Sequence, residues 1–128
     1  MKLERVSELY RELESRQEKL AAVKAATLQP ARHDMPPSQS VSKPTERIAV
    51  EILALEEEIS RLQAEIIGAK AELAIVILDK VTSPAVAQIL IRRYVRCETF
   101  QRIATEMRYS LRHVFRLHEK GKKEFLKE

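Results

Sequence analysis

The sequence from residue 100 to residue 119 reads FQRIATEMRYSLRHVFRLHE, and its apolar residues recur at helical spacing on either side of a break. This spacing predicts two short helices, one ending near Met107 and one beginning after Ser110. Thr99 and Ser110 are suited to cap the two helix starts, because their hydroxyl oxygens can accept backbone N–H groups. The side chains expected to face inward are Ile103, Ala104, Met107, Tyr109, Val114 and Leu117. Two short helices that share a core across a tight turn are typical of a helix-turn-helix unit.

A third helix is expected immediately before this pair. Ser83 can cap it, and Pro84 fits the first helical position, where a missing backbone N–H has no cost. We expect this helix over residues 84–96. The sequence therefore predicts a compact three-helix domain over residues 82–128.

The preceding part of the chain predicts two longer helices joined by a linker. Apolar periodicity indicates an amphipathic helix over residues 2–26, and residues 27–44 hold four of the five prolines, which indicates a linker. From Thr45 onward a heptad seam indicates a long helix. Its seam residues are Ile48, Ile52, Leu55, Ile59, Leu62, Ile66, Ala69, Leu73 and Val76. We therefore expect an all-α chain, in which residues 1–81 form a coiled-coil-like antiparallel helical hairpin before the helix-turn-helix domain.

The acidic flank of the long helix favours this hairpin over a parallel zipper. Four glutamates occupy equivalent heptad positions, so a parallel pair of identical helices would gain little from its charges. They are Glu51, Glu58, Glu65 and Glu72. Lys2 and Arg16 of the first helix can meet some of these glutamates. We expect the hairpin to dimerise further into a bundle, giving a homodimer.

The two parts of the chain differ in charge. Residues 82–128 hold 11 Lys and Arg against 5 Asp and Glu, whereas residues 1–81 hold 12 against 14. A cationic domain on a near-neutral body favours a polyanionic partner, because neutralising phosphates supplies most non-specific affinity for nucleic acids. Double-stranded DNA is the partner that we expect, with a solvated basic surface as the alternative.

The outer face of the last helix carries the candidate base-reading residues. An arginine can form two hydrogen bonds to guanine, and an apolar side chain can contact a thymine methyl group. The candidates on the first two turns are Leu111, Arg112, Phe115 and Arg116. Polar and basic residues around the helix pair are candidates for contact with phosphates. They are Thr99, Gln101, Arg102, Arg108, Ser110, Lys120, Lys122 and Lys123.

The C-terminal third of the chain also resembles a known family. The tracts at residues 91–95, 99–107 and 109–118 resemble small phage-encoded transcriptional regulators of the ArpU and RinA type. They are also similar to the DNA-binding fourth region of bacterial sigma factors. This resemblance implies a sequence-specific regulator, encoded by a phage or prophage, whose helix from Ser110 enters the major groove. It would carry base contact onto Arg112, Phe115 and Arg116.

Arg108 departs from the family pattern, because the related turn commonly has glycine at this position. If the turn needs a positive φ, arginine costs about 1 kcal/mol relative to glycine. The sequence leaves the geometry of this turn open.

Catalysis, metal binding and cofactor binding have no support in the sequence. His33, His113 and His118 lack the ligand spacing of a helical zinc site, and Cys97 is the single cysteine. The longest apolar run, residues 73–78, is too short to span a bilayer. We therefore expect a cytoplasmic protein that is not an enzyme and has no membrane segment.

Two other functions stay open at this point. The hairpin could bind a protein such as RNA polymerase while the basic domain only assists docking. A small-terminase-like DNA-packaging adaptor would also combine a helix-turn-helix with helical oligomerisation elements. Phe115 could also pack against the helix of residues 2–26, or against a second copy of the chain, instead of reading DNA.

Overall fold

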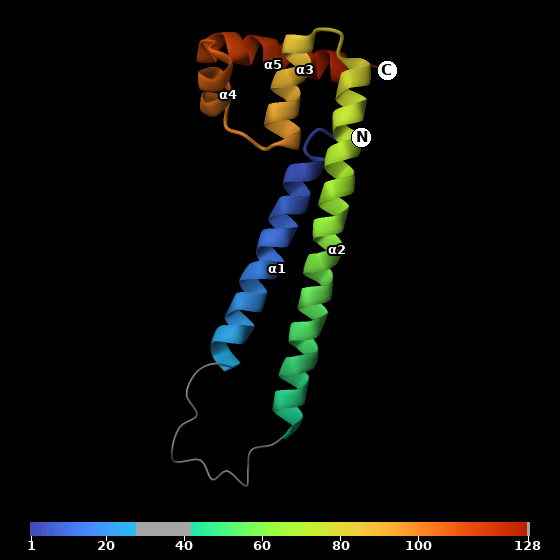
Figure 1. The fold of residues 1–128 in the computed structure, drawn as a ribbon, viewed down its shortest axis with the longest axis vertical. Coiled ribbons are helices and arrows are strands. Elements are labelled where there is room, and N and C mark those ends of the chain that lie inside the picture. Colours follow the sequence, from blue (N-terminus) through green and yellow to red (C-terminus); the bar gives the residue numbers. More distant parts are fainter. Residues whose placement is uncertain (28–41, 128) are drawn as a thin grey trace. The chain divides into compact units, whose positions relative to one another are not determined.

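The computed structural model describes residues 1–27 and 42–127, and its regular elements are all helical (Figure 1). They are α1 (Arg5–Thr27), α2 (Ser42–Lys80), α3 (Pro84–Leu90), the π-helical segment η2 (Ile91–Val95), α4 (Phe100–Met107) and α5 (Leu111–Leu126). The described residues contain no strand, so the expected all-α class is confirmed for them. The helix predicted over residues 84–96 is α3 continued by η2.

The linker predicted over residues 27–44 is shorter than expected at both ends. Thr27 is the last residue of α1, and residues 42–44 belong to the first turn of α2, so the predicted helix start at Thr45 is three residues late. Pro44 is compatible with this position, because the first N–H groups of a helix have no intrahelical acceptor. The rest of the predicted linker, residues 28–41, lies outside the described residues.

The chain packs as two compact units, a middle unit of Arg11–Ala64 and a C-terminal unit that combines Met1–Tyr10 with Glu65–Glu128. The C-terminal unit is therefore larger than the predicted domain of residues 82–128, because it also includes the start of α1 and the end of α2. The packing gives no separate support for a domain boundary after residue 81, which stays a prediction.

Ion pairs connect α1 and α2 within each unit. In the middle unit, Arg16 Nε lies 2.8 Å from Glu58 Oε2, as the heptad positions predict, and Leu13 and Leu55 are buried. In the C-terminal unit, the cation that meets Glu65 is Arg5, at 2.6 Å, rather than Lys2. A third ion pair in the described residues, of Lys24 Nζ with Glu56 Oε1 at 3.6 Å, uses neither a predicted cation nor a predicted glutamate. The heptad pattern thus identified two of the three glutamates and one of the three cations.

The core of the C-terminal helices contains all six residues that the sequence placed inward. Ile103, Ala104 and Val114 are buried together with Ile89 of α3, and the other members of the cluster pack against them. These other members are Phe100, Met107, Tyr109 and Leu117. In Figure 1, α3, α4 and α5 lie together around this core.

Gly121 allows α5 to approach α3 closely. A Cβ atom at this position would lie 2.7 Å from Val86 Cγ1 and 3.0 Å from Leu90 Cδ1, and both of these side chains are buried. By contrast, a Cβ atom at Gly68 of α2 would meet nothing within 4 Å. Replacing each glycine by alanine therefore separates the steric effect from the effect on helix propensity.

We expect the substitutions Gly121→Ala and Gly68→Ala to change stability in opposite directions. Gly68→Ala should raise the free energy of unfolding by about 0.5 to 1 kcal/mol, because alanine favours the helix. Gly121→Ala should lower it by about 1 kcal/mol net, since overpacking outweighs the same gain. Urea denaturation of the three proteins measures both changes. A Gly121→Ala variant stabilised like Gly68→Ala would contradict the close packing of α3 on α5.

Candidate nucleic-acid interface

The predicted N-terminal caps position α4 and α5. The Thr99 hydroxyl oxygen accepts a hydrogen bond from the Arg102 backbone N–H at 3.2 Å, and the Ser110 hydroxyl oxygen accepts one from the His113 N–H at 3.1 Å. Both predicted caps are therefore confirmed. Ser83 precedes α3 with extended backbone angles and Pro84 follows it, but the Ser83 side chain makes no capping hydrogen bond.

The turn between α4 and α5 requires a positive φ. Arg108 has φ 58° and ψ 40°, in the left-handed region. The Tyr109 N–H donates to the Ala104 carbonyl at 2.9 Å and the Arg108 N–H donates to the Thr105 carbonyl at 3.3 Å, which is the hydrogen-bond pattern of a Schellman motif. The cost foreseen for arginine, about 1 kcal/mol relative to glycine, therefore applies to this turn.

Replacing Arg108 by glycine should raise the free energy of unfolding by about 1 kcal/mol, because glycine adopts this backbone conformation without strain. Arg108→Ala is the matched control, since alanine removes the charge but keeps the Cβ atom. Thermal or urea unfolding of both variants tests the expectation. Equal stabilisation by glycine and alanine would assign the gain to charge removal instead of backbone strain.

The predicted base-reading residues are all exposed on α5. Leu111, Arg112, Phe115 and Arg116 occupy its first two turns. Phe115 is 44% exposed, and one side of its ring packs on Phe100 of α4 with 4.9 Å between ring centroids. Its ring therefore both supports the α4–α5 junction and leaves an apolar edge at the surface.

A hollow beside the start of α5 is lined by Ser110, Arg112, His113 and Arg116. Within it, Arg116 Nη2 lies 2.7 Å from His113 Nδ1, within hydrogen-bond distance. The His113 ring in turn meets the Tyr109 ring edge to face, with 4.8 Å between centroids. The hollow therefore combines two arginine side chains with the N-terminus of a helix. This environment favours hydrogen-bond acceptors and negative charge.

The predicted phosphate-contacting residues are also mostly exposed. Seven of the eight are exposed and Lys122 is half-buried. The exposed ones are Thr99, Gln101, Arg102, Arg108, Ser110, Lys120 and Lys123. Arg102 carries two carboxylate neighbours, because its Nε lies 3.0 Å from Glu106 Oε1 and 3.8 Å from Glu98 Oε1. Its charge is therefore offset within the protein, which the sequence interpretation did not anticipate.

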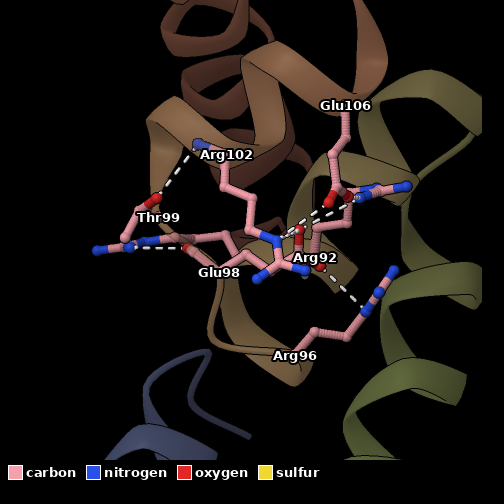
Figure 2. Close-up of polar contacts among 7 residues, drawn as sticks. Arg92, Arg96, Glu98, Thr99, Arg102 and Glu106 are labelled. Carbon is pink, nitrogen blue, oxygen red and sulfur yellow. Dashed lines mark hydrogen bonds and ion pairs between the residues drawn. The ribbon is translucent and has the colours of Figure 1, made fainter.

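Sequence reasoning missed an ion-pair network centred on Glu98, whose side chain is only 7% exposed (Figure 2). Glu98 Oε1 lies 3.2 Å from Arg92 Nη1, and Glu98 Oε2 lies 3.0 Å from Arg96 Nε. Arg92 also pairs with Glu106 of α4, so the network ties η2 to α4. Hydrogen bonds from Arg92 and Arg102 hold the pKa of the Glu106 carboxyl below its usual range.

The π-helical turn of η2 brings Glu98 back over Arg92. The Arg96 N–H donates to the Ile91 carbonyl at 3.0 Å, and the Glu98 N–H donates to the Arg92 carbonyl at 2.9 Å. Between them, Cys97 has φ 57°. The available signal in the sequence was a single glutamate that follows three arginines in a basic tract, but the widened turn that joins them leaves no periodic pattern.

A pair formed by the half-buried Tyr94 and the buried His118 links η2 to α5. The Tyr94 hydroxyl and His118 Nε2 lie 2.6 Å apart, and the rings stack. Burial, together with the positive charges of Lys122 and Arg93, lowers the pKa of His118, and the nearby Glu119 opposes this only partly. Burial also raises the pKa of Tyr94. His118 is therefore a hydrogen-bonded core residue whose lowered pKa favours the neutral imidazole.

Acidification should destabilise the C-terminal unit through His118. Its pKa in the folded chain lies below the ordinary value of 6.5, to which it returns on unfolding. Between these two values the unfolded state binds the extra proton, so the free energy of unfolding falls as the pH drops below about 6.5. We expect a lower melting temperature at acidic than at neutral pH. His118→Gln should lose most of this pH dependence; an unchanged pH dependence would exclude His118 as its cause.

Metal-binding clusters and membrane-spanning helices are absent from the described residues. They contain no cluster of three or more His, Cys, Asp and Glu side chains arranged to hold a metal ion, and His33 lies outside them. None of the described helices combines the length and the apolar character needed to cross a membrane. Comparisons of the chain with protein-family models, with curated proteins and with solved structures found no match.

Proposed function

We propose that this chain is a sequence-specific DNA-binding transcriptional regulator that inserts α5 into the major groove. The observation that carries the proposal is the capped α4–turn–α5 unit, in which Arg112 and Arg116 are exposed on the first turns of α5 and line one hollow with Ser110. A recognition helix presents its N-terminal residues to base edges, and arginine is the side chain best suited to guanine.

The remaining candidates divide between base and backbone contacts. Leu111 and the exposed edge of Phe115 would contact thymine methyl groups. Phosphate contacts would come from the exposed lysines Lys120 and Lys123 and from Arg108 at the turn. Because Arg102 already has carboxylate partners, we rank it below these residues as a phosphate contact.

The finer architecture belongs to the same proposal. Residues 1–81 would form an antiparallel hairpin, supported by the ion pairs of Arg16 with Glu58 and of Arg5 with Glu65. Its acidic flank would avoid DNA and favour a protein surface. We propose a homodimer in the cytoplasm that reads two half-sites about one helical turn, roughly 34 Å, apart. The resemblance to ArpU- and RinA-type regulators agrees with this arrangement.

Selection of bound sites from a pool of random DNA duplexes tests the proposal. We expect one enriched motif, with palindromic symmetry if the protein binds as a dimer. The affinity for this motif should exceed the affinity for unrelated duplexes, and both should fall as the salt concentration rises. Absence of an enriched motif, together with absence of binding at moderate salt, would overturn the proposal.

A second candidate function, contact with RNA polymerase, is favoured by exposed apolar residues of α2. Ile67, Ile75 and Leu78 of the C-terminal unit are all more than half exposed. Binding of the full chain to purified RNA polymerase, compared with a variant in which these three residues are serine, distinguishes this function. A small-terminase-like adaptor would instead form large rings in sedimentation, whatever the state of these residues.

A further inference from the structure

The side chain of Arg116 has a fixed partner on its own helix. Arg116 Nη2 lies 2.7 Å from His113 Nδ1, one turn earlier in α5. A guanidinium group can only donate hydrogen bonds, so Nδ1 is the acceptor and the imidazole proton lies on Nε2. The contact uses one of the five N–H groups of the guanidinium and leaves enough of them for a two-bond contact with guanine.

His113 is itself held from two sides. Its ring packs edge to face on Tyr109, with 4.8 Å between centroids, and Tyr109 packs against the buried cluster of Ile103 and Val114. The backbone N–H of His113 donates a hydrogen bond to the Ser110 hydroxyl oxygen, at 3.1 Å. A continuous series of contacts therefore runs from the hydrophobic core to the guanidinium of Arg116.

We propose that His113 is a positioning residue that sets base specificity by holding Arg116 in the geometry that reads one guanine. This inference rests on the proposed DNA-binding function. A long side chain that is already ordered loses less conformational freedom on binding, which corresponds to a gain of about 2- to 10-fold in affinity. The gain applies only to the correct base pair, because only that pair uses the ordered geometry.

The experiment measures base discrimination, which is the ratio of affinities for the selected site and for the same site with one base pair replaced. Both affinities come from one protein preparation, so partial unfolding of a variant cancels in the ratio. The base pair read by Arg116 is identified as the one at which Arg116→Ala loses discrimination. The variants are His113→Ala, His113→Asn, Arg116→Ala and the His113→Ala/Arg116→Ala double variant.

We expect His113→Ala to lower discrimination by about 2- to 10-fold at the Arg116 base pair and to leave the other positions unchanged. His113→Asn should restore discrimination, because its amide oxygen can accept the same hydrogen bond. In the Arg116→Ala background, His113→Ala should have no further effect on discrimination. Full discrimination in His113→Ala, an equal loss at every position, or failure of asparagine to restore it would each overturn the proposal.

The test separates this inference from the proposed function. If the wild-type chain shows no preference among DNA sequences, the proposed function fails, and the role of His113 fails with it. If the wild-type preference is clear and His113→Ala retains it, DNA recognition stands and only the positioning role is overturned.

Discussion

Replacing Glu98 by alanine should lower the free energy of unfolding by about 3 kcal/mol, because it breaks a buried ion pair and leaves Arg92 with only the more exposed Glu106 as a carboxylate partner. Glu98 is only 7% exposed, and its partner Arg92 is only 15% exposed. Water therefore cannot replace the lost carboxylate, and the junction between η2 and α4 would loosen. Urea denaturation followed by circular dichroism measures the loss.

Glu106→Ala is the matched control for this prediction. Its carboxylate also pairs with Arg92, but it is 37% exposed, so solvent can compensate more of the lost interaction. We expect a clearly smaller loss of stability than for Glu98→Ala. A loss from Glu106→Ala as large as that from Glu98→Ala would show that burial does not set the strength of this network.

Replacing Arg112 and Arg116 by alanine should produce the largest change in DNA binding. Each substitution should reduce the affinity for the selected site by about 1 to 3 kcal/mol and relax base preference at one position, because a two-bond contact with guanine is lost. Both side chains are exposed, so the variants should retain the fold. Fluorescence anisotropy with labelled duplexes measures the affinities and the base preferences.

Lys123→Ala is the appropriate control for the arginine variants. Lys123 is exposed, whereas Lys122 is half-buried and acts on the buried His118, so its substitution would mix two effects. Lys123→Ala should weaken binding to all sequences alike. It should also reduce the slope of log affinity against log salt concentration by about 1, which corresponds to the loss of one phosphate contact. If the double arginine variant bound the selected site as tightly as the wild-type chain, reading of bases by α5 would be excluded.

The proposed DNA-binding face depends on features that act against stability in the isolated protein. Arg108 keeps a positive φ that glycine would adopt without strain, and it adds a cation at the turn. The Arg108→Gly variant should therefore fold more stably and bind DNA less tightly. Opposite changes in these two measurements are expected where a residue serves binding at some expense of stability.

The sequence by itself determined the helices, the caps at Thr99 and Ser110 and the inward residues of the helix-turn-helix. These features depend on residues within about four positions of one another, so periodicity and capping chemistry are sufficient to identify them. The spacing of Arg102 and Glu106 is equally local, and it would have predicted their ion pair. The exposed face of α5 followed from the same local pattern.

Only the tertiary structure decided which cations pair with Glu98 and Glu65. The buried Glu98 network depends on the wider π-helical turn of η2, whose hydrogen bonds span five residues instead of four, and on the packing of η2 against α4. The approach of Gly121 to Val86 and the pairing of Arg5 with Glu65 likewise join residues far apart in the sequence. Such contacts follow from the register and close packing of whole helices, and a repeating pattern of apolar residues specifies which face is buried without specifying these distances.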